Sequence, residues 1–223
     1  MKKSLSTIPR FWAFAFSALL SGGSQSSDAP LEVCSGAALW DTTHPSLPQT
    51  TGKDENLRNE LKSRVEKDQA ARKGWLANQA DESLAQAVDT IDTENLAWLR
   101  QLVSEQGFPD ADAVGTEGVH YAWLLLQHAD QDPAFQSSLL PVLEKRFADH
   151  ELPANDLARL ADRILVASGK PQKYGTQFDW FSGNFELPPA LEVTKIDAER
   201  RRLGLMPLND YVCTIRRARA KVN

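Results

Sequence analysis

The sequence predicts a mainly α-helical protein, a compact multi-helix bundle with one small β-hairpin near residues 174–187. Two observations predict the bundle: apolar side chains recur at helical spacing after residue 54, and Asp, Gly and Pro stand where such segments begin and end. A third predicts the hairpin. Aromatic and polar residues alternate on either side of Ser182-Gly183-Asn184, which is typical of two strands joined by a glycine turn.

The N-terminal segment, residues 1–27, predicts a signal peptide. Lys2, Lys3 and Arg10 precede an uncharged apolar run over residues 11–20, and small and polar residues follow it. This order is typical of a secretory signal, and the run is shorter than the roughly 20 residues that span a membrane. We therefore expect an exported protein, periplasmic or extracellular, with no membrane association after cleavage. An interfacial or uncleaved anchor is the alternative.

Residues 28–53 predict a flexible linker, because they are rich in Pro, Ser, Thr and Gly and lack apolar periodicity. Residues 54–223 are long enough for a single helical domain with one core. Cys34 and Cys213 lie near opposite ends of the exported chain, and an oxidising compartment would permit them to pair. A catalytic thiol is less favoured, because neither cysteine has a histidine close to it in the sequence.

The charge of the chain bears on its partners. The formal charge is −5, and removing residues 1–27 would take away three basic groups and no acidic one, giving −8. An acidic surface repels a phosphate backbone, so we expect no nucleic acid as partner. An unknown protein or a small-molecule ligand remains. Whether the protein uses a cofactor, and which one, is left unknown by the sequence.

Start and stop signals divide the domain into helices. Asp92 precedes an apolar series and is predicted as an N-cap, while Pro141 predicts a kink or two shorter helices. Asp132 with Pro133 predicts another helix start, and Asn155 predicts a cap. The expected helices cover residues 57–76, 92–107, 117–130, a segment from 132, residues 157–167 and 197–203, and a last segment from 207.

The predicted helix over residues 117–130 is apolar in nearly every direction, which indicates burial. His120, Gln127, His128 and Asp130 are its anomalies, since a buried polar group needs a partner. On a regular helix His128 and Asp130 lie about 200° apart, so they could hold one ion only if the helix ended at Ala129. We therefore predict no metal. His128 and His120 are candidate catalytic residues, because histidine titrates near neutral pH.

Short blocks of this sequence resemble a bacterial family known only as a domain of unknown function. The most specific are Gln127-His128-Ala129-Asp130 and Tyr174-Gly175-Thr176-Gln177, and the resemblance spans about residues 57–211. It implies no activity, but it implies that the polar residues of these blocks belong to one shared arrangement. That set is Glu66, Asp68, Gln69, Arg72, His120, Gln127, His128, Arg163, Gln172, Tyr174 and Gln177.

Two functions remain open. The first is a non-catalytic ligand- or protein-binding module with a buried polar network. The second is a hydrolase or lyase with His128 or His120 as general base and Arg163 binding an anionic substrate group. The first is favoured, because no nucleophile stands beside a base; Arg163 could equally pair with Asp68 or Glu66. The candidate ligand-binding residues are Arg163, Tyr174, Gln177, Gln127, Gln172, Asp68 and Arg72.

Overall fold

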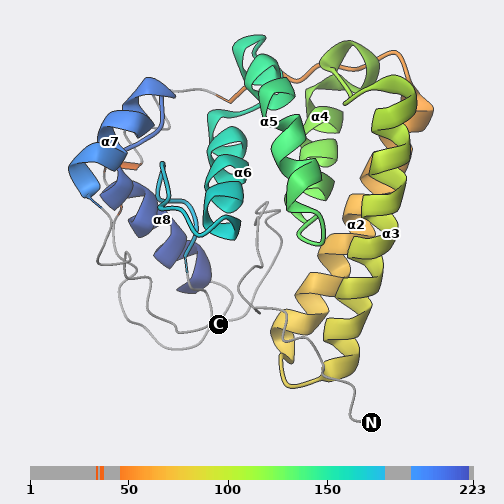
Figure 1. Cartoon of the computed structure of the whole chain (residues 1–223), viewed down its shortest axis with the longest axis horizontal. Coiled ribbons are helices and arrows are strands. Elements are labelled where there is room, and N and C mark those ends of the chain that lie inside the picture. Colours follow the sequence, from red (N-terminus) through yellow and green to blue (C-terminus); the bar gives the residue numbers. More distant parts are fainter. Residues whose placement is uncertain (1–33, 35, 38–45, 179–191, 221–223) are drawn as a thin grey trace.

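The computed structural model describes residue 34 and residues 36–37, 46–178 and 192–220. As predicted, it is mainly helical, and the described residues contain seven helices and no strand (Figure 1). The helices are α2 (Glu55–Ala77), α3 (Glu82–Gln106), α4 (Ala111–Gln127), α5 (Pro133–Ala148), α6 (Ala154–Ala167), α7 (Val193–Arg202) and α8 (Leu208–Ala220).

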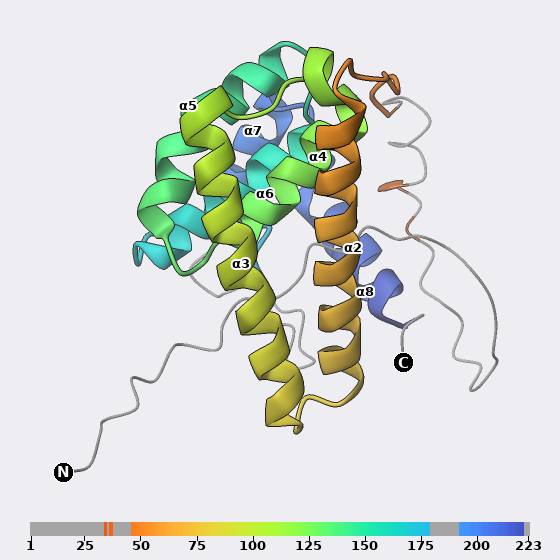
Figure 2. The same cartoon turned by 90° about the vertical axis from the view of Figure 1, so that its right-hand side faces the viewer.

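Helices α2 and α3 form a long antiparallel hairpin whose far end extends past α4, α5 and α6 (Figures 1 and 2). Asp54 and Asp81 begin the two helices, because their side chains accept hydrogen bonds from the backbone N–H groups of Leu57 and Ser83. The prediction that Asp92 is a cap is therefore wrong. Asp81 caps α3, and Asp92 lies well inside it.

Helix α4 lies at the centre and contacts α2, α3 and α6. The predicted burial is confirmed for residues 122–126, which are all buried, whereas Tyr121 is partly buried. The helix ends earlier than predicted, at Gln127, so His128 is its C-cap residue and Asp130 lies beyond it. This early end turns the side chains of these two residues away from the directions that a continued helix would give them.

Residues 46–53, which belong to the predicted linker, pack against the start of α4. Thr50 and Thr116 exchange two hydrogen bonds between backbone N–H and side-chain hydroxyl, of 3.2 and 3.0 Å. Gly115 has a φ of 75°, and a Cβ there would lie 2.3 Å from the carbonyl oxygen of Thr50. Glycine is thus needed for this close approach.

Helices α5 and α6 complete the main core. Asp132 caps α5 as predicted, and α5 continues through Pro141 without dividing. The prediction that Asn155 caps α6 is wrong, since α6 begins at Ala154 after Pro153, whose ring already sets a φ of −63°.

The predicted hairpin is not supported. Tyr174–Phe178 form no strand, and residues 179–187 lie outside the described residues. The cause is the buried carboxylate of Asp162, which accepts hydrogen bonds from the backbone N–H groups of Lys173, Tyr174 and Thr176 at 2.7, 2.9 and 2.8 Å. These donors would otherwise pair with a neighbouring strand. The segment is a loop held on α6.

Helices α7 and α8 lie on the side of α6 that faces away from the α2–α3 hairpin and share a smaller core (Figure 1). The predicted disulfide between Cys34 and Cys213 is present, with Cα atoms 5.7 Å apart, and it attaches the segment around residue 34 to α8. A disulfide is compatible with export. The predicted signal peptide, residues 1–27, lies outside the described residues.

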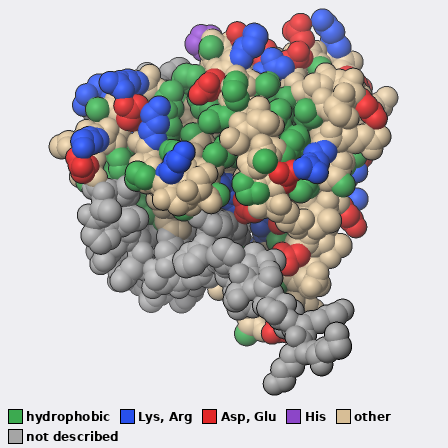
Figure 3. All heavy atoms as spheres, viewed as in Figure 1, with side chains coloured by type: hydrophobic (Ala, Val, Ile, Leu, Met, Phe, Trp, Pro, Cys, Tyr) green, Lys and Arg blue, Asp and Glu red, His purple; other side chains and the backbone are tan. Residues whose placement is uncertain are grey.

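Within the described residues, no helix has the length and apolar character to cross a membrane. On the face drawn in Figure 3, acidic and basic side chains are interspersed over the described surface.

Candidate functional site

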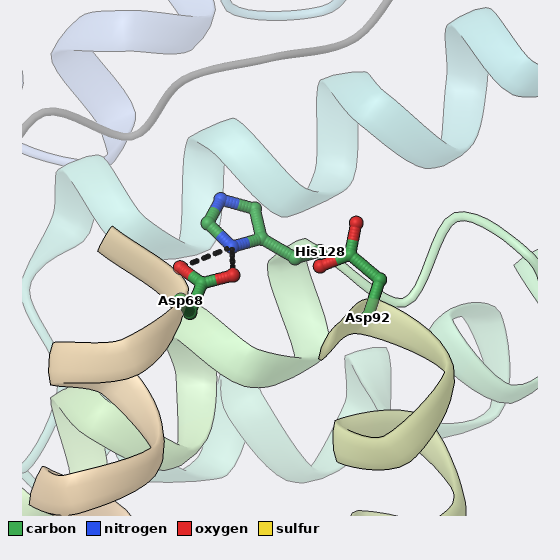
Figure 4. A group of neighbouring side chains, drawn as sticks. All are labelled: Asp68, Asp92 and His128. Atoms are coloured by element: carbon green, nitrogen blue, oxygen red, sulfur yellow. Dashed lines mark hydrogen bonds and ion pairs between the residues drawn. The ribbon is translucent and has the colours of Figure 1, made fainter. Parts of the chain in front are cut away.

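A buried group of charged side chains lies where α2, α3 and the end of α4 meet. Asp68 and Arg72 come from α2. Figure 4 shows Asp68 on α2, Asp92 on α3 and His128 at the end of α4. Asp68 and His128 are only 1% and 3% exposed. Charged groups this deep need partners, and we call these four residues, with Asp130 and Arg163, the His128 network.

Asp68 orients the ring of His128. The Nδ1 atom lies 3.0 Å from each carboxylate oxygen of Asp68. We assign the proton to Nδ1, because a lone pair there would face two anionic oxygens. The other ring nitrogen, Nε2, then carries the lone pair. It is buried, has no hydrogen-bond partner, and points away from both carboxylates in Figure 4.

Arg72 joins the two acidic side chains across the helices. Its Nε–H is directed at both Asp68 Oδ1, at 3.0 Å, and His128 Nδ1, at 3.1 Å; with the proton assigned to Nδ1, it donates to Asp68. Its Nη2 donates to Asp92 Oδ1 at 2.5 Å. Asp92, which was predicted to cap a helix, therefore accepts a charge-assisted hydrogen bond at a partly buried position.

A metal ion does not fit this arrangement. Donor atoms of Asp68, Asp92 and His128 lie within 4.8 Å of one another, a spacing that one ion could bridge. The guanidinium of Arg72 contacts all three residues, however, so a cation already occupies the position between them. We assign no metal to these residues.

Arg163 extends the network to α6. Its Nε donates to Asp130 Oδ1 at 2.6 Å and its Nη2 to Asp130 Oδ2, a bidentate pair. If Arg163 had a structural role, the sequence predicted an ion pair with Asp68 or Glu66. The observed partner is Asp130 instead. Because Asp130 accepts from both nitrogens, these donors are not open to an anionic substrate group. Gln136 of α5 also reaches this turn, donating to the carbonyl of Leu126 at 3.0 Å.

The network shifts its titrating groups in opposite directions. Burial raises the pKa of Asp92 to about 7, against the pull of Arg72, and the charge of Asp68 adds to the rise. Burial and the neighbouring Arg72 lower the pKa of His128, although Asp68 opposes them. For Asp68, burial acts to raise the pKa, but His128 and Arg72 outweigh it and lower it. His128 is thus neutral, and Asp92 can gain a proton near neutrality.

His120 belongs to a different cluster. It lies eight residues before His128, more than two helical turns away. Its Nδ1 lies 2.6 Å from Asp156 Oδ2, and its ring stacks on Trp123 with 5.2 Å between centroids. Burial lowers its pKa, but the hydrogen bond and charge of Asp156 raise it overall. The two candidate histidines therefore do not share one site.

Gln172, Tyr174 and Gln177 form a third cluster, in the loop on Asp162. The side chain of Gln172 donates to the carbonyl of Gln177 and accepts from its backbone N–H, both at 2.8 Å. Gln177 Nε2 donates to the carbonyl of Arg159 at 3.1 Å. Tyr174 packs with Ala158 in a small apolar cluster. These side chains stabilise the loop. The resemblance implied one shared arrangement of polar residues, but the structure divides them among three separate clusters.

Several other predicted residues have clear positions. Gln69 Nε2 donates to Asp68 Oδ2 at 2.7 Å. Gln127 is 2% exposed, and its Oε1 has no partner within the described residues. Glu66 is exposed, near Lys62. Two surface hollows, one beside Lys53 and one beside Trp98, include no residue of the His128 network.

Sequence reasoning missed Asp92 and Asp162. A signal for Asp92 existed: it lies four residues after Val88 and four before Leu96, which places a carboxylate on the buried stripe of α3. Asp162 directly precedes Arg163 in the sequence. No local sequence pattern there distinguishes a buried carboxylate from a solvated one. Its four hydrogen bonds come from residues 173–176.

Comparison with protein families confirms the resemblance. Residues 55–222 match the model described as "Family of unknown function (DUF6624)", and the chain belongs to this family. Neither the curated proteins nor the solved structures provide a match. Cys34 lies outside the matched residues, whereas the whole His128 network lies inside them.

Proposed function

We propose that this domain binds a small ligand and that His128 Nε2 accepts a hydrogen bond from it. The observation that carries the proposal is the unpartnered, buried Nε2 of a ring whose other nitrogen is held by Asp68. A buried polar atom without a partner costs about 1 to 3 kcal/mol, so a native protein retains it for a reason. A bound donor group would supply that reason.

The network around the ring suits this role. Asp68 keeps the proton on Nδ1, which leaves Nε2 as an acceptor, and Arg72 favours the neutral ring by its charge. The ligand therefore presents an O–H or N–H group to His128. The other members join α2, α3, the end of α4 and α6, so ligand binding would stabilise the packing of these elements.

An enzyme, a hydrolase or lyase with His128 as general base, is the second candidate. The Asp68–His128 pair favours it, because a carboxylate that orients an imidazole is how many general bases are arranged. The opposed shifts of the pKa of Asp92 and His128 also favour it. Against it, Arg163, the predicted anchor for an anionic substrate group, is engaged with Asp130. His120 is engaged with Asp156.

The setting of this function is export. The Cys34–Cys213 disulfide supports an oxidising compartment, the periplasm or the exterior, as the working place of the chain. The ligand would then be a small molecule of that compartment or a group presented by a protein there. The apolar run within residues 1–27 would direct the chain to it.

Two substitutions of His128 test the role of Nε2. His128→Asn keeps a donor for Asp68 at the place of Nδ1 but removes Nε2, whereas His128→Gln keeps an acceptor near Nε2. Native mass spectrometry after incubation with a small-molecule extract measures the bound mass. We expect an adduct on the unchanged protein, its loss in His128→Asn, and partial retention in His128→Gln.

The matched control is His150→Asn, at an exposed position with a φ of 60° that asparagine tolerates. It should retain the adduct. The proposal is wrong if the unchanged protein carries no adduct, or if folded His128→Asn carries the same one.

A further inference from the structure

We propose that Asp92 is a positioning residue for His128: acting through Arg72, its ionised form strengthens Nε2 as an acceptor, and its protonated form weakens it. The inference deepens the proposed function and rests on it, because it concerns the regulation of the same site. It would make ligand binding at His128 depend on pH, although His128 itself stays neutral.

A continuous series of contacts joins the two residues. Asp92 Oδ1 accepts from Arg72 Nη2 at 2.5 Å, and Arg72 Nε donates to Asp68 Oδ1 at 3.0 Å. The same carboxylate of Asp68 accepts the Nδ1 proton of His128 at 3.0 Å. Every link is at least partly buried, so water screens these charges far less than at the surface.

The charges that face Asp92 are unbalanced. Helix α2 contributes Asp68 and Arg72, the turn after α4 contributes Asp130 and the neutral His128, and α6 contributes Arg163, paired with Asp130. Three carboxylates thus face two guanidinium groups. Burial is the first cause of the raised pKa of Asp92, about 7, and the charges of Asp68 and of the more exposed Asp130 add to the rise.

The sign of the effect follows from the geometry. Ionised Asp92 draws Arg72 toward α3 and adds negative charge near the ring, and both favour a more basic Nε2. When Asp92 is protonated, Arg72 is compensated by Asp68 alone, which then accepts less strongly from Nδ1. A ligand that donates to Nε2 should therefore bind more tightly as the pH rises through about 7.

The test follows the nitrogen atoms of His128 in the full chain. Histidine is labelled with nitrogen-15, and the chemical shifts of Nδ1 and Nε2 are recorded from about pH 5 to about pH 9. The variants are Asp92→Asn, which keeps the shape and removes the charge, and the control Asp89→Asn, at an exposed position one turn earlier on α3. No ligand is needed.

We expect the Nε2 shift of the unchanged protein to have an inflection near pH 7, with the Nδ1 proton in place throughout. It should disappear in Asp92→Asn and remain in Asp89→Asn. A flat curve in the unchanged protein, or an inflection that survives Asp92→Asn, overturns the inference.

If Asp92→Asn does not fold, the carboxyl carbon of Asp92 is titrated in the unchanged protein. Its midpoint must coincide with the His128 inflection, and different midpoints overturn the inference. The two proposals fail separately. If a ligand binds at His128 with the same affinity below and above pH 7, the pH-dependent role of Asp92 is wrong, while the proposed ligand-binding function stands. If the Nε2 inflection is observed but the chain binds no ligand, the proposed ligand-binding function is wrong, while the coupling of Asp92 to His128 stands.

Discussion

At the scale of residues, the determining feature is that the carboxylate of Asp68 accepts hydrogen bonds from three partners, His128, Arg72 and Gln69. Asp68 accepts from the Nδ1 proton of His128 and from Arg72 Nε, and it is 1% exposed. An ionised carboxylate in such a position is stable only while its donors remain. The sequence identified His128 as a buried polar residue in need of a partner, whereas Asp68 and Arg72 entered only through the family resemblance. The contacts of His128 with these two residues join positions 56 to 60 residues apart.

Asp68→Asn should lower the free energy of unfolding by about 2 to 4 kcal/mol, since it leaves buried Arg72 with one carboxylate and weakens the orientation of His128. Urea unfolding followed by circular dichroism measures this. Glu66→Gln, at an exposed position two residues earlier on α2, is the control and should change stability by less than about 0.5 kcal/mol. An equal effect of both changes would contradict the network.

The pH dependence of Asp92 has a defined sign. Its pKa rises from 3.8 to about 7 on folding, so the folded state binds more protons than the unfolded state between these values. The free energy of unfolding should therefore fall as the pH rises from about 4 to about 7. Asp92→Asn should match the unchanged protein near pH 4 and exceed it near pH 8 by up to about 4 kcal/mol.

Urea unfolding of both proteins at the two pH values checks this, with Asp89→Asn as the exposed control. Less stability in Asp92→Asn at the higher pH would mean that the Arg72–Asp92 pair stabilises the fold more than its burial costs.

At the scale of elements, helical periodicity predicted most helices, whereas ends and loops depended on contacts that periodicity does not contain. Asp92 has the sequence context of a cap, but Asp81 begins α3 earlier. The loop that was predicted as a strand has its backbone donors bound by Asp162, more than ten residues away. The buried carboxylate of Asp162 binds these backbone donors, and residue spacing alone does not indicate such a contact.

Asp162→Asn should release this loop. The amide retains a single acceptor oxygen and places an N–H₂ group against backbone donors, so we expect a loss of about 2 to 4 kcal/mol. Hydrogen exchange of the amides of Lys173, Tyr174 and Thr176 should become faster. Asp149→Asn, near the end of α5, is the control. Unchanged exchange in Asp162→Asn would show that other contacts hold the loop.

At the scale of the whole molecule, the disulfide joins positions 179 residues apart and lies partly outside the family match. The sequence predicted the pair from compartment and count alone. It could not predict that Cys34 would be buried beside Tyr211 and Val212 in the core of α7 and α8. The disulfide therefore joins Cys34, which precedes the family match, to Cys213 of α8 within it.

Reduction of the disulfide should lower the midpoint of thermal unfolding, because it increases the conformational entropy of the unfolded chain. The free energy of unfolding should fall by at most about 5 kcal/mol. Thermal unfolding with and without a thiol reductant measures this. The double variant Cys34→Ser with Cys213→Ser should melt at the lower temperature and should not respond to reductant. A response in the double variant would contradict this origin of the stability.

The central claim is that His128 presents an unprotonated, unpartnered Nε2 while Asp68 holds the Nδ1 proton. The nitrogen-15 chemical shifts of the two ring nitrogens, measured in the folded chain at pH near 7.5, test it most directly. The claim predicts a protonated Nδ1 and an unprotonated Nε2 whose shift moves when a ligand binds. A proton on Nε2, with Nδ1 accepting from Arg72, would contradict it.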